Sequence, residues 1–245
     1  MKTYIHSFNK ELRQQNQPKV ANNKFTRRLI QPKTPEAAYL LGFLWADGYI
    51  SSTQNRITIE ILSTDFLDIG FDKILPEFGN WNVYLRNRPN RQAQHFATLT
   101  NNTYLHDFLI DNDYTSKNSS PDKILSRIPK NLHQFWFRGL SDGDGCFYNG
   151  PVRLPVEQRY ISQYCIGSTY EQDWSYMTKK FDKLNITKYS IKQGISKLGH
   201  KNSIIRITNV KDIVKFGQFI YGSTLGPNLG RKYTKYLDIQ TRASI

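Results

Sequence analysis

Two predicted helices of this chain both end in Asp-Gly, and this repetition constrains the fold more than any other feature. The first apolar segment, Ala37 to Ala46, leads into Asp47-Gly48, and the second, Phe135 to Leu140, leads into Asp144-Gly145. The two aspartates lie 97 residues apart, at positions 47 and 144. A pattern that recurs within one chain predicts two structurally similar halves.

Each segment also carries signals for a helix start. Thr34 suits the N-cap position, and Pro35 suits the first turn. Asn131 to Gln134 can form a capping box before the second helix. Gly48 is suited to close the first helix in the left-handed conformation. We therefore expect one helix from Thr34 through Ala46 and a second that runs into Asp144.

The residues that follow each helix match as well. Ile57 to Ile61 and Tyr160 to Tyr164 alternate as strands do. Each run leads into a hexamer of the form STxxxD, at Ser63 to Asp68 and at Ser168 to Asp173, which can open a helix. The further elements that we predict are helices at about 65–78, 104–109, 170–184 and 212–221, and strands at about 81–88, 94–100, 188–196 and 203–208.

The order of these elements predicts the fold class. Helix, strand pair, helix, strand pair and helix occur twice, which indicates an α+β fold of two pseudo-symmetric αββαββα repeats. We assign the first repeat to residues 35–128 and the second to residues 129–245. Residues 1–34 are polar and lack a sustained period, which predicts a basic N-terminal arm. That arm is either a solvated tail or a contact to phosphates through Arg27-Arg28.

Leu40–Gly48 (LLGFLWADG) and Phe137–Gly145 (FRGLSDGDG) resemble the nine-residue signature of the LAGLIDADG homing endonucleases. The resemblance extends over most of the chain beyond the N-terminal arm. It implies that the two repeats pack on these helices and that their antiparallel sheets form a DNA-binding saddle. Trp45 stands where the signature has Asp, and Arg138 and Ser141 occupy more variable positions. These departures predict a metal site that the two halves share unequally.

The two aspartates are the predicted metal ligands and catalytic residues. Gly42 and Gly139 leave one face of each helix without side chains, so close packing can bring Asp47 and Asp144 together. Two carboxylates about 5 Å apart repel by about 3 kcal/mol at an effective dielectric of about 20, and each helix C-terminus adds to this cost. Mg²⁺ offsets both effects and prefers such oxygen ligands, and Mn²⁺ or Ca²⁺ can occupy the same site. The expected chemistry is phosphodiester hydrolysis.

An Asp-Gly pair after a helix has two other interpretations. A single Asp-Gly after a helix is usually only a cap and a turn. Asp142 to Gly145 also suggests a calcium loop, but that loop needs Glu eleven positions after Asp142, where this chain has Arg153. The calcium-loop interpretation is therefore rejected.

The resemblance further implies a basic residue beside the attacking water in each half. Lys117 and Lys232 stand at the matching positions, and we assign them a catalytic role. They could instead bind phosphate or be solvated. Ser63 and Ser168 could order water near the metal, although a role as helix N-caps is favoured.

Basic side chains are spread over the predicted strands and turns, and the net charge is +14. Asn82, Tyr84 and Arg86 alternate with apolar neighbours, as on a sheet with one wet face. Arg and Lys on such a face bind phosphates and read base edges in the major groove, whereas the alternative is a purely solvated surface. We assign DNA contact to Arg56, Arg86, Arg88, Arg91, Lys188, Lys192, Lys197 and Arg231.

The remaining sequence features exclude other classes of protein. The ten-residue apolar run from Ala37 to Ala46 is too short to span a bilayer, and the N-terminus has no stretch typical of a signal peptide. Cys146 and Cys165 lack metal-finger spacing and are expected to be small core residues of a reduced, intracellular chain.

The sequence therefore predicts a monomeric, Mg²⁺-dependent endonuclease that cuts both DNA strands at a long asymmetric target. Because the chain begins with Met1 and lacks a C-terminal His-Asn ending, a mobile-intron or free-standing enzyme is expected rather than an intein. Two alternatives stay open, an RNA-splicing maturase and a DNA-binding regulator on the same fold. The presence of both Asp47 and Asp144 argues against the regulator.

Overall fold

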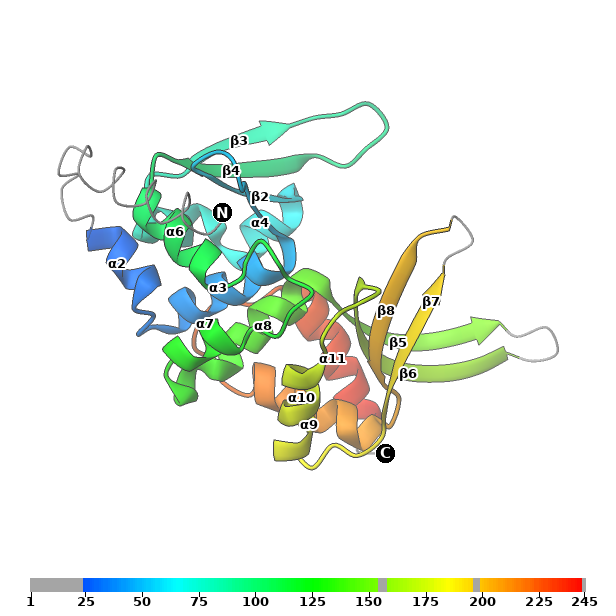
Figure 1. The fold of residues 1–245 in the computed structure, drawn as a ribbon. Helices are drawn as coiled ribbons and strands as arrows, with labels where there is room; N and C mark the ends of the chain where they lie inside the picture. Colours follow the sequence, from blue (N-terminus) through cyan, green and yellow to red (C-terminus); the bar gives the residue numbers. More distant parts are fainter. Residues whose placement is uncertain (1–23, 154–157, 196–198, 244–245) are drawn as a thin grey trace.

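The computed structural model describes residues 24–153, 158–195 and 199–243. Within these residues, two four-stranded antiparallel sheets accompany a group of helices (Figure 1). The sheets have the strand orders β1-β2-β4-β3 and β5-β6-β8-β7, so the second repeats the topology of the first. The predicted α+β class with two αββαββα repeats is confirmed.

The elements follow one another in the same order in both halves. The first half contains α3 (Pro35–Asp47), β1 (Gly48–Ile50), β2 (Arg56–Leu62), α4 (Ser63–Ile69), α5 (Phe71–Ile74), η1 (Leu75–Phe78), β3 (Asn82–Arg86), β4 (Gln94–Thr100) and α6 (Thr103–Asp111). The second contains α8 (His133–Asp144), β5 (Gly145–Arg153), β6 (Gln158–Thr169), α9 (Ser175–Lys183), β7 (Tyr189–Ile195), β8 (Lys201–Ile207), α10 (Val210–Tyr221) and α11 (Gly230–Ala243). The elements outside this repeat are α2 (Lys24–Ile30), α7 (Asp122–Arg127) and η2 (Lys130–Leu132).

Helices α3 and α8 cross at the centre of the molecule, and two glycines set their separation (Figure 1). A Cβ atom built on Gly42 would lie 1.9 Å from the carbonyl oxygen of Trp136. A Cβ atom on Gly139 would lie 2.1 Å from the carbonyl oxygen of Tyr39. These are backbone contacts, so no side chain can rotate away to make room. The two helices can approach this closely only because both positions are glycine.

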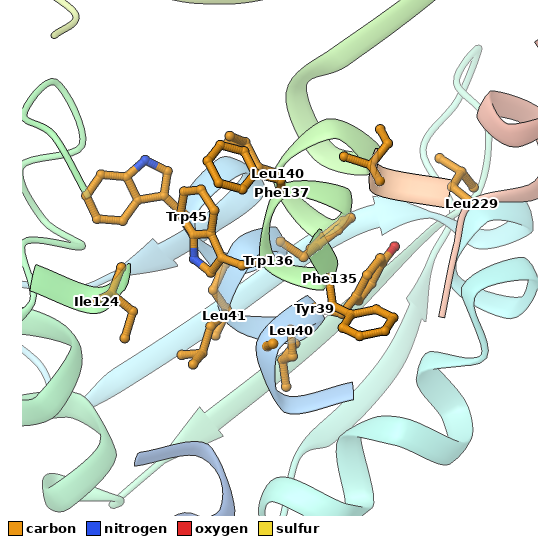
Figure 2. Close-up of a cluster of buried hydrophobic side chains, with 14 of the residues drawn as sticks. Tyr39, Leu40, Leu41, Trp45, Ile124, Phe135, Trp136, Phe137, Leu140 and Leu229 are labelled. Carbon is orange, nitrogen blue, oxygen red and sulfur yellow. The ribbon is translucent and has the colours of Figure 1, made fainter. Parts of the chain in front are cut away.

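Large aromatic side chains fill the core around this crossing (Figure 2). The ring of Trp45 lies 5.1 Å from that of Tyr114 and 6.3 Å from that of Trp136, between ring centroids. Trp136 in turn contacts Phe137 at 5.1 Å. Each such ring removes roughly 150–250 Å² of surface from water, so this cluster stabilises the junction of the two halves.

Each sheet has one face packed against the helices and one open face. Ile57, Ile59 and Ile61 of β2 are buried, while Thr58 and Glu60 between them face the other side. The same alternation holds along β6, where Tyr164 and Ile166 are buried. Because successive side chains of a strand point to opposite faces, the open faces carry the polar residues.

The helix caps differ in part from the sequence predictions. Thr34 caps α3 as predicted, with its hydroxyl accepting from the Ala37 amide at 3.3 Å. Gly48 is not left-handed, because its φ of −72° and ψ of 142° already belong to strand β1. The predicted capping box at 131–134 is wrong, since α8 begins at His133 without a side-chain cap.

Two predicted helices have different bounds. The helix expected at 65–78 is interrupted at Gly70, whose φ of 80° turns the chain between α4 and α5. The helix expected at 170–184 begins at Ser175, because the strand β6 continues to Thr169. Neither Ser63 nor Ser168 is therefore a helix N-cap.

Three helices were not predicted. Helix α2 lies within the supposed arm, and its Leu29 is fully buried. Helix α7 connects the halves, and α11 follows α10 at the C-terminal side. In the described part of the chain, no helix has the length and apolar character needed to cross a bilayer.

Candidate functional site

The C-terminal ends of α3 and α8 meet, and each presents one aspartate. A Cβ atom on Gly143 would lie 2.4 Å from the Cβ atom of Ala46 and 3.2 Å from an Asp47 carboxylate oxygen. The last turn of α8 is therefore in contact with the last turn of α3. Asp47 and Asp144, the final residues of these helices, both reach solvent at this junction, while the surrounding helix ends partly desolvate their carboxyl groups.

The electrostatics of the junction disfavour two bare carboxylates. Partial burial raises the pKa of Asp144 to about 6, and the charge of Asp47 adds to the effect. Burial likewise raises the pKa of Asp47, against the opposing charges of Lys232 and Lys117. Both carboxyl groups would be relieved by a nearby cation.

Lys232 and Lys117 lie at equivalent places behind the two aspartates. The Lys232 ammonium donates to the carbonyl oxygens of Ser141, Asp142 and Gly143 at 3.0, 2.6 and 2.8 Å. The Ser141 carbonyl also accepts from the Gly145 amide, whereas the last carbonyls of a helix have no partner within it, so Lys232 completes the helix end. It also places a positive charge where the helix dipole is negative.

Lys117 does the same for α3 with one contact fewer. Its ammonium donates to the carbonyl oxygens of Ala46, at 3.2 Å, and Gly48. An ammonium has three donors, so Lys117 keeps one free of these two contacts while Lys232 uses all three. Burial lowers the pKa of Lys117 to about 8, and it also lowers the pKa of Lys232. The two halves thus share one arrangement of aspartate and lysine, but they differ in the number of lysine donors that the helix end occupies.

The signature position that differs between the helices, Trp45 against Asp142, is buried in both halves. Asp142 is buried and accepts hydrogen bonds from the hydroxyls of Tyr39 and Tyr221 at 2.9 and 2.6 Å, and from the Leu229 amide at 2.8 Å. Burial raises its pKa to about 6, and these bonds oppose the shift. The difference between Trp45 and Asp142 therefore changes the packing of the core and leaves the two carboxylates at the helix ends alike.

The other two departures from the signature are also structural. Arg138 is buried, and its guanidinium donates to carbonyl oxygens of Ile220, Ser223, Leu225 and Pro227 at 2.6 to 3.1 Å. It thereby holds the loop between α10 and α11. Ser141 shares a 2.7 Å hydrogen bond with the hydroxyl of Tyr164.

Arg231, predicted to contact DNA, links the two halves. Its guanidinium donates to both carboxylate oxygens of Asp65 on α4, at 2.9 and 2.7 Å. The neighbouring Gly230 amide donates to Asp68 at 2.7 Å. The start of α11 is therefore fixed to the first half beside Lys232. Two guanidinium nitrogens of Arg231, Nε and Nη2, already donate to Asp65. The predicted DNA contact would therefore fall to the third nitrogen, Nη1.

The comparisons with known proteins concern the fold. No protein-family model and no curated protein sequence matches this chain. I-SmaMI bound to uncleaved DNA in the presence of calcium ions is similar in structure, with a TM-score of 0.53 and 14% identity, over 85% of this chain and 90% of that one. The LAGLIDADG meganuclease I-CpaMI bound to uncleaved DNA gives a TM-score of 0.53 and 12% identity, over 85% and 90% of the two chains. The I-LtrWI LAGLIDADG homing endonuclease bound to target DNA gives 0.53 and 13%, over 86% and 90%.

This chain has the LAGLIDADG fold. Helices α3 and α8 are accordingly its two LAGLIDADG helices, and the sheets β1–β4 and β5–β8 belong to its two repeats.

The ends of the LAGLIDADG helices offer a donor set that fits a hard divalent cation. Asp47 and Asp144 supply carboxylate oxygens to one junction. Among the described residues, no cluster of three or more His, Cys, Asp and Glu side chains is present to hold a metal by itself. Mg²⁺ is commonly held by one or two carboxylates, with water and substrate phosphates completing the shell. The site fits an ion that is bound together with a phosphate.

The open face of the first LAGLIDADG sheet carries several of the predicted DNA-contacting residues. Arg56 and Arg86 occupy it in register with Thr100 and Gln94. The Arg86 guanidinium lies 5.3 Å from the ring centroid of Phe96, on which Tyr84 also stacks at 5.4 Å. The other two basic residues of this half lie at the β3–β4 hairpin: Arg88, 3.6 Å from Glu60, and Arg91, which is exposed.

The second sheet presents Lys192 on its open face and Lys188 just before β7, both exposed. Lys197 lies outside the described residues. Two features of these faces were missed from the sequence. Tyr49 is 57% exposed on the open face of β1, and Arg206 of β8 pairs with Cys165 on the open face of β6. A side chain can be assigned to the open or the packed face only when the strand bounds are known, and the sequence did not give those of β1 and β8.

The prediction for the cysteines is wrong. Cys146 is exposed and Cys165 is half-buried, so they are not core residues. The core positions of these strands belong to their neighbours Phe147, Tyr164 and Ile166. Both cysteines therefore lie on the open face of the second sheet.

Proposed function

We propose that this chain is a site-specific, metal-dependent endonuclease that cuts both strands of duplex DNA. The observation that carries the proposal is the pair of equivalent helix ends, each with one aspartate in front and one lysine behind. Asp47 with Lys117 and Asp144 with Lys232 form two copies of one arrangement in contact with each other. Two copies suit a duplex, whose two strands run in opposite directions and present two phosphates.

The charges of the site fit this reaction. Asp47 and Asp144 would hold Mg²⁺ against the scissile phosphates, and their raised pKa values make the cation an effective counter-charge. A bound divalent ion supplies charge neutralisation and a water of lowered pKa. Lys117, with one donor free of its helix-capping contacts, can donate to a phosphate oxygen or an attacking water. Lys232 instead maintains the carbonyls of α8.

The open faces of the two sheets would hold the DNA. Arg56, Arg86 and Lys192 lie on these faces, and the net charge of +14 favours a polyanion. The open faces of the two halves are not identical: Tyr49 follows the first helix end where Cys146 follows the second. A single chain with unlike halves is expected to recognise an asymmetric target as a monomer. The related structures named above include enzymes bound to DNA, which supports a DNA substrate.

Cleavage of a randomised plasmid library tests the proposal. Supercoiled plasmids with randomised inserts are incubated with the protein and Mg²⁺, and linear products are sequenced. We expect linear DNA cut at one recurrent asymmetric sequence, and no product with a chelator. Binding without cutting under all divalent ions would favour the DNA-binding regulator. Selective binding of structured RNA, with no DNA cutting, would favour the maturase.

A further inference from the structure

The chain has two cysteines, and the fold brings them together. Cys146 follows the LAGLIDADG helix α8 as the second residue of β5, and Cys165 lies on β6. The antiparallel register pairs these two residues directly with each other. Nineteen positions separate them in sequence, so only this register makes them neighbours.

The pairing suits a disulfide. Residues directly opposite in an antiparallel pair have Cα atoms about 4.5 or about 5.5 Å apart, depending on whether they exchange backbone hydrogen bonds. Both separations lie within the range of about 4.4–6.8 Å that disulfides span. The two side chains point to the same face of the sheet, because directly paired residues of an antiparallel ladder share a face. Both cysteines are free thiols in this structure.

The pair is accessible and lies beside the candidate metal site. Cys146 is exposed and follows Asp144 by two residues. Their side of the sheet is the open one, since Phe147 and Tyr164 on the opposite side are buried. Arg206 lies next to Cys165 on the neighbouring strand. A small oxidant can therefore reach the pair in the free protein.

We propose that Cys146 and Cys165 are a redox modification site, which a peroxide-class oxidant converts to a reversible cross-strand disulfide that bound DNA would cover. With hydrogen peroxide, the first thiol loses its proton and its sulfur attacks one peroxide oxygen, so that an S–O bond forms, the O–O bond breaks and the departing hydroxide takes up that proton as water. The second thiol sulfur then attacks the first sulfur, the S–S bond forms, the S–O bond breaks and a second water leaves. Two electrons pass to one peroxide, and both thiol protons end in water.

The covering by DNA rests on the proposed function. DNA lying across the open faces of the sheets, with its scissile phosphates at Asp144, would exclude solvent from residue 146 as well. The free protein would then be oxidised readily, and the complex would be protected. The disulfide itself does not depend on that function.

The first experiment tests the disulfide. The full-length reduced protein at low concentration is treated with one equivalent of hydrogen peroxide, and intact mass and free thiols are followed. We expect both thiols to disappear together with the loss of two hydrogen atoms, and dithiothreitol to restore both. Cys146→Ser and Cys165→Ser, checked for folding by circular dichroism, serve as controls that keep one thiol each. Sulfinic acid or cross-linked dimers as the main wild-type products would overturn the proposal.

The second experiment tests whether bound DNA covers the two cysteines. Oxidation is repeated with mixed-sequence duplex DNA in low salt and Ca²⁺, and fluorescence anisotropy reports binding in the same samples. We expect disulfide formation to slow several-fold when DNA is bound and to recover when high salt releases it. Equal rates with DNA demonstrably bound would overturn the placement of the pair under DNA. An absence of any DNA binding would instead contradict the proposed function, while the disulfide result would stand.

Discussion

At the scale of single residues, the site combines two carboxylates that resist ionisation with two lysines that are already hydrogen-bonded. The raised pKa of Asp144 means that the folded protein holds this proton more tightly than the unfolded chain does. The lysines are tied to backbone carbonyls, so each has a structural task besides any role in cutting.

The first prediction concerns pH. The pKa of Asp144, about 6, lies above the ordinary 3.8, so its stabilising contribution is fully present below about pH 3.8 and is lost as pH rises through 6. In metal-free buffer, Asp144→Asn should therefore gain melting temperature relative to the wild type between about pH 4.5 and about pH 7.5. Thermal unfolding across this range measures the difference. A constant offset between the two proteins would contradict the raised pKa.

The second prediction separates the two lysines. Lys232→Met should lower the free energy of unfolding by about 1–3 kcal/mol, because it removes the ammonium donor from three carbonyls at the end of α8. Lys117→Met should slow cutting more than it weakens DNA binding, because it removes a donor that is free to contact phosphate or water. Urea unfolding and cleavage kinetics provide the measurements.

The matched control for this pair is Lys235→Met, also on α11, where the lysine is exposed and its ion pair with Asp238 spans 3.7 Å. This variant should change stability by less than about 0.5 kcal/mol. Equal changes in unfolding free energy and in cutting rate for the three variants would show that the lysine contacts to the carbonyls contribute to neither stability nor cutting.

At the scale of elements, the crossing of α3 and α8 fixes the site. Replacing Gly139 by Ala places a Cβ atom 2.1 Å from the Tyr39 carbonyl oxygen, so the helices must separate. We expect Gly139→Ala to lose more than about 2 kcal/mol of unfolding free energy. Gly167→Ala is the control, because its Cβ atom would meet Ile204 at an ordinary 3.9 Å. Chemical denaturation of both variants measures the two losses. An unchanged free energy of unfolding for Gly139→Ala would mean that the helices do not pack this tightly.

A second element-scale prediction concerns the attachment of α11 to α4. Arg231→Met should destabilise the protein by about 1–3 kcal/mol, because the mostly buried Asp65 carboxylate loses its two guanidinium donors. DNA affinity should change less than for Arg86→Met. Urea unfolding and anisotropy titrations test both parts. A large affinity loss without loss of stability would restore Arg231 as a DNA contact.

Local signals predicted most elements, and non-local contacts account for most of what was missed. The alternation in β2 and the Thr34 cap can be read from neighbouring residues, as can the repeated Asp-Gly. The break at Gly70 was missed because an apolar helical period continues past it, and only its left-handed backbone interrupts the helix. The Arg231–Asp65 pair joins residues 166 positions apart, and the pairing of the two cysteines depends on strand register. Neither follows from a local pattern.

At the scale of the whole molecule, the charge of +14 and two open sheet faces predict salt-sensitive DNA binding. If about six phosphates are neutralised, affinity should fall by about 10³ between about 50 mM and about 200 mM salt. Anisotropy titrations in Ca²⁺ measure the slope, and Lys192→Ala should reduce it by about one. Lys73→Ala, on α5 behind the first sheet, should leave it unchanged. Salt-independent binding would contradict contact through these faces.

The proposed function requires Asp47 and Asp144 to form one metal site together for cutting both strands. Its most direct test is cleavage by Asp47→Asn and Asp144→Asn on a target recovered from the plasmid library, with DNA affinity measured in parallel. Asp182→Asn, an exposed position on α9, is the matched control. The account predicts that each helix-end variant loses double-strand cutting while it still binds DNA, and that the control cuts normally. Wild-type cutting by either helix-end variant would contradict it.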